Sequence, residues 1–323
     1  MSLPYLVRLT CLLAVVAGMS QILLQLILAL AARPLLRLMR EASERQRERA
    51  LYLLQVGPVL MAFFFAGAVF LPQYVRHEPG AGAERVGWIS VLLAAGVLLW
   101  FGTTAARGLR VAGRTMRFVR ASKRAGQDSG IRRSGIPVIS LPNEWPVVAL
   151  AGLLHPVILI PQDFLESGGL SEEALELALD HERSHAACMD NWKLLSLNFL
   201  PRIPFDPAGS TWFEQWQRAA ECAADDDAVR GDSARRLLLA DTLLRIARTV
   251  HPPQSPMIYT ALISRNEELA ARIDRLIRNP VFPSASQRSI LPQYIAVTLL
   301  IVGTVVAISP WIYGVSELIL HLG

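Results

Sequence analysis

The stretch that determines the fold of this chain is residues 171–190, which read SEEALELALDHERSHAACMD. Ser171 is a typical helix N-cap, and Glu172 and Glu173 suit a first helical turn, where carboxylates interact favourably with the helix dipole. The residues that follow are mainly apolar, as expected of a helix that packs into a core. The pattern therefore predicts a helix from about residue 171 to Met189.

This predicted helix contains an HExxH motif, formed by His181, Glu182 and His185. Residues four apart share one face of a helix, so both imidazoles can bind one metal ion while Glu182 lies beside it. Two imidazoles with an open coordination position suit Zn²⁺, and the adjacent carboxylate can act as the catalytic base. The alternative is a polar helix face with two incidental histidines. Because buried imidazoles without partners are costly, the apolar surroundings favour one zinc ion per chain.

A catalytic zinc ion needs a third protein ligand. No histidine follows at the spacing of HExxHxxGxxH sites. The sequence Glu221-Cys-Ala-Ala-Asp225 instead places two carboxylates on one face of another predicted helix. We expect Glu221 to be the third ligand and Asp225 to hydrogen-bond the far nitrogen of a ligand histidine. A solvated acidic run is the alternative, but the alanines around Glu221 suit close packing against the first helix.

Other residues with metal-binding side chains receive structural roles. Cys188 and Cys222 are expected to be small core residues, and His155 and His251 to lie on the surface or in loops. Asp190 could orient a ligand or cap a helix end, and we narrowly favour the structural role.

The composition indicates a membrane protein, because 52% of the 323 residues are hydrophobic and only 18% are charged. Four apolar blocks are each long enough to cross a bilayer: residues 9–32, 51–75, 86–106 and 290–315. The first block also resembles a signal peptide, but it is longer than a typical signal core and an arginine-rich segment follows it. We therefore expect a retained span.

The excess positive charge, +5 overall, predicts the orientation of the spans. Arginine and lysine gather between the first and second blocks, after the third and before the fourth. Positive loops stay in the cytoplasm, so the N-terminus should lie outside and residues 107–289 inside. These clusters adjoin apolar blocks and lack interleaved aromatics, so we expect them to contact the lipid bilayer and no nucleic acid.

The predicted domains are a membrane domain (1–108), a cytoplasmic metallopeptidase domain (109–289), and a fourth span with a short external tail (290–323). In the peptidase domain, residues 121–135 are polar and are expected to form a linker. Short apolar runs predict strands at residues 136–140, 146–150 and 156–160. Further helices are predicted for residues 212–230, 233–250 and 266–278, so the fold class is α+β and mostly helical.

Several of these features resemble the membrane metallopeptidases of the BlaR/MecR type, which are β-lactam sensors and signal transducers. The features are the strand segment Pro146–Pro161, the HExxHxxxxD pattern of 181–190, the ExxxD pattern of 221–225, and Arg272-Ile273 before the last span. The order of three spans, protease and fourth span is also similar. The resemblance implies a gluzincin-like zinc peptidase in a bacterial-type inner (plasma) membrane. It also implies a cytoplasmic protein substrate, such as a winged-helix repressor of the BlaI/MecI kind.

One departure from this family concerns the sensor. Antibiotic-sensing members carry a penicillin-binding domain after the fourth span, whereas this sequence ends at Gly323 and contains no Ser-x-x-Lys motif. We therefore expect no covalent β-lactam binding, and the signal would come through the spans, the outer loop or a separate sensor protein.

Two hypotheses concern the substrate. The segment around Val148, Ala149 and Gly152 is expected to bind an extended substrate by β-strand addition. Family members also cut themselves, for which residues 283–289 are the expected place. Two alternative functions remain open: a quality-control protease of the HtpX or CAAX-protease kind, and a zinc-bearing membrane transducer without activity.

Overall fold

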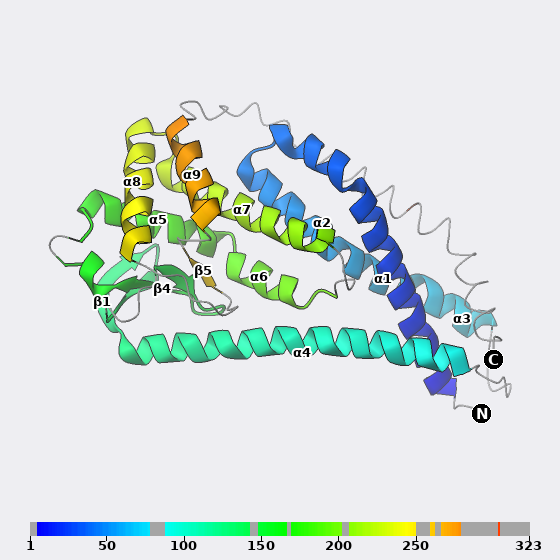
Figure 1. The fold of residues 1–323 in the computed structure, drawn as a ribbon. Coiled ribbons are helices and arrows are strands. Elements are labelled where there is room, and N and C mark those ends of the chain that lie inside the picture. The colour runs from blue at the N-terminus through cyan, green and yellow to red at the C-terminus, as the bar shows by residue number, and fades with distance from the viewer. Residues whose placement is uncertain are drawn as a thin grey trace.

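The fold is described from a computed structural model that covers residues 5–77, 88–142, 148–166, 169–201, 207–249, 259–261, 266–278 and 303. Most described residues are helical, and a small sheet lies at one end of the molecule, as predicted (Figure 1). The predicted fourth span and the predicted self-cleavage segment 283–289 lie outside the described residues, apart from position 303.

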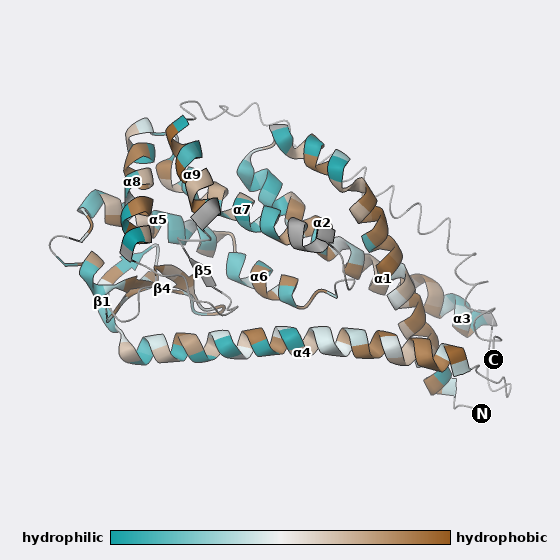
Figure 2. Cartoon of the chain, viewed as in Figure 1, coloured by the Kyte–Doolittle hydropathy of each residue, from teal (hydrophilic) through white to brown (hydrophobic). Residues whose placement is uncertain are grey.

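Three of the described helices are long and apolar enough to cross a membrane, and they coincide with the first three apolar blocks that were predicted as spans (Figure 2). They are α1 (Tyr5–Leu38), the helix that begins with α2 (Glu44–Phe64), and α4 (Trp88–Ala125). A short 3₁₀ turn, Met39–Glu41, follows α1. The second helix continues through a π-helical turn, Phe65–Phe70, into α3 (Leu71–His77).

The predicted linker at residues 121–135 is wrong. Helix α4 continues without interruption to Ala125, and residues Gln127–Arg133 form strand β1. Arginine and lysine have good helix propensity, so the basic part of α4 remains helical beyond its apolar part. The chain then turns at Gly126, where an added Cβ would lie 2.4 Å from Ile139 Cγ2.

The sheet has five strands in the order β1-β2-β4-β3-β5. The three predicted strands are present as β2 (Ile136–Leu141), β3 (Ala149–Ala151) and β4 (Val157–Pro161). β1 pairs antiparallel with β2 through a turn in which Ser134 and Gly135 both have positive φ. β2 and β4 are parallel, and β3 lies antiparallel between β4 and the unpredicted β5 (Tyr259–Ala261).

Five helices follow the central strands in the chain: α5 (Glu172–Ala187), α6 (Asp190–Asn198), α7 (Pro207–Val229), α8 (Ser233–Thr249) and α9 (Asn266–Arg278). The face of the sheet opposite to α5 is covered by α4 (Figure 1). A 3₁₀ turn, Gln162–Phe164, precedes α5. Ser171 caps α5 by accepting a hydrogen bond from the Ala174 amide, 3.2 Å away. The first predicted helix ends earlier than expected, because Met189 is left-handed (φ 54°) and separates α5 from α6.

Two hydrophobic cores position the site. One joins the sheet to α5, α7, α8 and α9 and includes Ile158, Leu177 and Leu239. The other joins α2 to α6 and α7 and includes Leu51, Leu194 and Trp216. The N-terminal part of α2 is thus part of the same packed unit as α6 and α7 of the predicted peptidase domain.

Candidate metal centre

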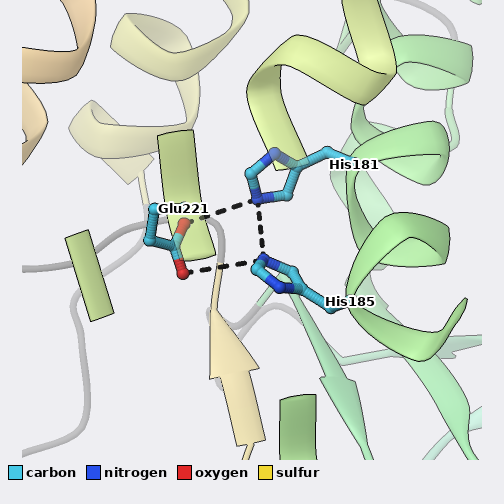
Figure 3. Close-up of side chains that lie close together, drawn as sticks. All are labelled: His181, His185 and Glu221. Carbon is cyan, nitrogen blue, oxygen red and sulfur yellow. Dashed lines mark hydrogen bonds and ion pairs between the residues drawn. The ribbon is translucent and has the colours of Figure 1, made fainter. Parts of the chain in front are cut away.

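Helix α5 brings the two histidines of the HExxH motif together. Both side chains are completely buried, and their Nε2 atoms lie 3.1 Å apart (Figure 3). This separation is close to the value of about 3.3 Å between two ligand atoms on a tetrahedral ion with bonds of about 2.0–2.1 Å.

Helix α7 supplies the carboxylate that faces both histidines. Glu221 Oε2 lies 3.4 Å from His181 Nε2, and Glu221 Oε1 lies 3.6 Å from His185 Nε2 (Figure 3). One ligand atom from each of the three residues lies within 4.8 Å of the others. The close approach of α5 and α7 depends on small buried side chains of α7: Ala219, Ala220, Ala223 and Ala224.

A second carboxylate stands behind each imidazole. Asp225 Oδ1 lies 3.0 Å from His181 Nδ1, and Asp190 Oδ2 makes a 2.8 Å hydrogen bond with His185 Nδ1. The sequence narrowly favoured a helix-end role for Asp190, whereas the structure places it in the first turn of α6 and against His185. Orientation of a ligand was the other alternative for Asp190, and the left-handed Met189 before α6 is what brings Asp190 to His185.

These contacts make the site suitable for a cation. A carboxylate accepts hydrogen bonds, so Asp190 favours a hydrogen on His185 Nδ1, and the Nε2 atoms of both histidines face Glu221. Burial alone would lower the pKa of His181, but the carboxylates of Asp225 and Glu221 outweigh it and raise that pKa to about 9. The surroundings therefore attract positive charge to these nitrogens, as a divalent metal site with His₂Glu ligands requires.

Arg272 of α9 is a component of the site that sequence reasoning did not assign. Its side chain is 1% exposed; Nη1 lies 2.8 Å from Glu221 Oε2, and Nε and Nη2 donate to both oxygens of Asp225 at 2.9 and 2.7 Å. Burial alone would raise the pKa of Glu221 and of Asp225, but the Arg272 guanidinium outweighs it and lowers both. Arg272 therefore keeps these two carboxylates ionised.

Glu182 points from α5 toward strand β3. The carboxylate is fully buried, and its Oε2 accepts a 2.6 Å hydrogen bond from the Leu150 amide. Within the part of the chain that the structure describes, its Oε1 has no hydrogen-bond partner. Burial raises the pKa of the Glu182 carboxyl, which the nearby histidines offset only in part. The result is an oriented carboxyl group with one oxygen available for proton transfer.

Strand β3 does not offer the free edge that the sequence analysis expected for a substrate. Val148 and Ala149 are buried, and Gly152 follows the strand with φ +99°. One edge of β3 pairs with β4, and the other pairs with β5, through Ala149–Ala261 and Ala151–Tyr259. The chain's own residues 259–261 thus occupy the edge at which strand addition was predicted.

The remaining metal-binding side chains lie outside this cluster. Among the described residues the metal-binding geometry involves His181, His185 and Glu221, without either cysteine. Cys222 is buried and Cys188 is partly buried, and burial raises the pKa of Cys222 to about 12. His155 is exposed, as expected, whereas His251 lies outside the described residues.

Comparison with known proteins gives one family match. The sequence profile described as BlaR1 peptidase M56 matches residues 69–276, well over half of the chain, and this range contains every residue of the cluster. A search of curated proteins found no match.

Proposed function

The chain belongs to the BlaR1 peptidase M56 family, and from this premise we propose that it is a membrane-embedded zinc endopeptidase. Membership confirms the resemblance to BlaR/MecR proteins and makes the chain a BlaR1-type membrane metallopeptidase. The zinc ion, the residue roles and the substrate are the proposal.

The observation that carries this proposal is the convergence of His181, His185 and Glu221, with a further carboxylate behind each imidazole. The three side chains would hold Zn²⁺, the ion used by M56 peptidases. When bound, the ion would polarise the scissile peptide carbonyl and increase the acidity of a water molecule. Asp190, Asp225 and Arg272 would keep the ligands oriented and correctly charged.

Glu182 is the proposed general base and acid. The Leu150 amide fixes Oε2, so that Oε1 would take a proton from the attacking water and later deliver it to the departing amine nitrogen. The raised pKa of Glu182 suits this second step, because the carboxyl retains the proton until the amine receives it.

The proposed substrate is a cytoplasmic protein, such as a winged-helix repressor of the BlaI/MecI kind. The orientation rests on the basic segments that flank the apolar helices, including the basic half of α4. We further propose that the signal reaches the peptidase through the spans, the outer loop or a separate sensor protein. The substrate analogy comes from the family alone.

The test compares cleaved cytoplasmic proteins between cells with the wild-type chain and cells with Glu182→Gln. We expect cleavage to fall by about 10²–10⁴-fold in the variant, while zinc remains bound. Glu173→Gln is the matched control, since Glu173 lies on the exposed face of the same helix. Unchanged proteolysis in Glu182→Gln would remove the enzymatic proposal and favour a transducer without activity. Cleavage of many unfolded membrane proteins would favour a quality-control protease.

Self-cleavage is a second candidate function, and one observation favours it. Strand β5 lies antiparallel along β3, and β3 also carries the amide that holds Glu182. An extended substrate in a zinc peptidase is expected to pair with such a strand. We therefore propose residues near 259–261 as a cleavage segment, in addition to the predicted 283–289. N-terminal sequencing of the fragments would identify the cut, which Glu182→Gln should abolish.

A further inference from the structure

The first turns of α2 contact the peptidase domain on both flanks of His185. On one flank, Arg45 Nη2 donates to Ser184 Oγ at 2.7 Å and to Asp227 Oδ2 at 2.8 Å. Ser184 directly precedes the ligand histidine, and its hydroxyl also donates to Asp227 at 2.7 Å. Arg45 thus ties α2 to both α5 and α7.

On the other flank, Glu48 enters the domain from one turn further along α2. Its side chain is completely buried. Glu48 Oε1 accepts hydrogen bonds from Lys193 Nζ at 2.7 Å and from Trp216 Nε1 at 3.1 Å. Glu48 is therefore held by α6 and α7 at once.

Lys193 continues this connection to the metal centre. The same Nζ donates to Asp190 Oδ1 at 2.9 Å, and the other oxygen of Asp190 makes the 2.8 Å bond with His185 Nδ1. An unbroken chain of charged contacts thus runs from Glu48 through Lys193 and Asp190 to His185. It joins an apolar helix suited to cross the membrane to a predicted metal ligand.

The burial of this chain argues against an incidental contact. Glu48 and Asp190 are 0% exposed and the Lys193 side chain is 16% exposed. Buried charges are costly unless geometry and hydrogen bonding compensate them, and an apolar pair of similar volume is often at least as stable. The main effect of these buried contacts is therefore to fix the positions of the side chains and not to add stability. The last side chain that they fix is the imidazole ring of His185.

We propose that Glu48 and Lys193 are positioning residues through which helix α2 controls how His185 is held. Displacement of α2 along or about its axis would move the Glu48 carboxylate relative to α6. Lys193 would then either follow Glu48 and draw Asp190 away from His185, or lose its hydrogen bond to Asp190. This inference rests on the proposed zinc site, and it makes the second apolar helix the element that regulates metal binding and activity.

The test uses the full-length chain in detergent micelles, with the variants Glu48→Gln, Lys193→Met and the double substitution. Glu44→Gln is the matched control, because Glu44 lies one turn earlier on α2 and is partly exposed. The readouts are the Zn²⁺ dissociation constant from chelator competition, the Co²⁺ absorption spectrum, and the melting temperature of the metal-free protein.

We expect Glu48→Gln to weaken Zn²⁺ binding about tenfold, the lower end of the effect of changes around metal ligands. The Co²⁺ spectrum should shift. The metal-free melting temperature should also fall, because the variant removes one partner of a buried ion pair, whereas Glu44→Gln should leave all three readouts near their wild-type values. Lys193→Met should behave similarly, and the double variant should be no weaker than the worse single one, because both act through one chain of contacts. Lys193→Arg should restore part of the affinity.

Two results would overturn the inference: a Zn²⁺ affinity of Glu48→Gln within twofold of the control, or additive losses in the double variant. If Glu48→Gln fails to fold, Lys193→Met and its rescue by Lys193→Arg decide the same question. A wild-type chain that binds no Zn²⁺ would overturn both this inference and the proposed function. Unchanged proteolysis in Glu182→Gln would remove the enzymatic proposal but would leave this inference about the metal site standing.

Discussion

Replacing Arg272 by methionine tests whether its positive charge compensates the buried carboxylates of Glu221 and Asp225. The substitution keeps much of the side-chain volume but removes three contacts of 2.7–2.9 Å to two carboxylates. Removing one partner of a buried ion pair costs about 3–5 kcal/mol, because the other charge stays buried without compensation. We therefore expect the metal-free protein to lose about 3–5 kcal/mol of unfolding free energy.

The assay is thermal unfolding in detergent, followed by tryptophan fluorescence, with and without Zn²⁺. For a domain of about 200 residues each kcal/mol corresponds to about 2–4 °C, so the metal-free melting temperature should fall by about 6–20 °C. Bound Zn²⁺ places positive charge beside Glu221, so the decrease should be smaller with zinc than without it. The Arg278→Met control on the same helix should change little, because Arg278 is 79% exposed. A metal-free loss for Arg272→Met no larger than that of Arg278→Met would refute the reasoning.

Three further predictions concern packing, thiol reactivity and ligand orientation. An added Cβ at Gly108 would lie 2.6 Å from the Phe199 ring, whereas Gly113 of the same helix has open space. Gly108→Ala should therefore destabilise the protein by about 1–3 kcal/mol and Gly113→Ala should not, as measured by chemical denaturation. Cys222 is 5% exposed and its pKa is about 12, so iodoacetamide at pH 8 should label it only after unfolding. Rapid native labelling, read by mass spectrometry, would contradict that burial. Asp190→Asn should weaken Zn²⁺ binding by about 10–100-fold in chelator competition, and an unchanged affinity would exclude Asp190 as the group that orients His185.

Local signals in the sequence predicted much of the fold. Ser171 caps its helix as expected, three apolar blocks form long helices, and three strands lie where short apolar runs predicted them. The polar strand β1 was missed because its residues alternate without an apolar face, so the segment resembled a linker. Met189 was missed because a left-handed residue other than glycine leaves no clear signal in sequence.

In the candidate site, too, some residues could be predicted from the local sequence and others could not. The four-residue spacings in 181–185 and 221–225 place side chains on one face of a helix, and such placement can be predicted from local sequence. Arg272 and Lys193 contact partners that are 47 and 145 residues away in the sequence, Asp225 and Glu48 respectively. Those contacts depend on how helices pack, which no local pattern specifies. The pairing of β5 with β3 was missed for the same reason.

The continuity of α4 has a mechanical consequence. Its 38 residues form a rod of about 57 Å at about 1.5 Å per residue. Gly126 is the one residue between the end of this helix and strand β1, and it packs closely against Ile139 of the sheet. A tilt of about 10° at the apolar end would swing the sheet end of such a rod by about 10 Å. A change in the tilt of α4 would therefore also move the sheet, whose strand β3 supplies the amide that is hydrogen-bonded to Glu182.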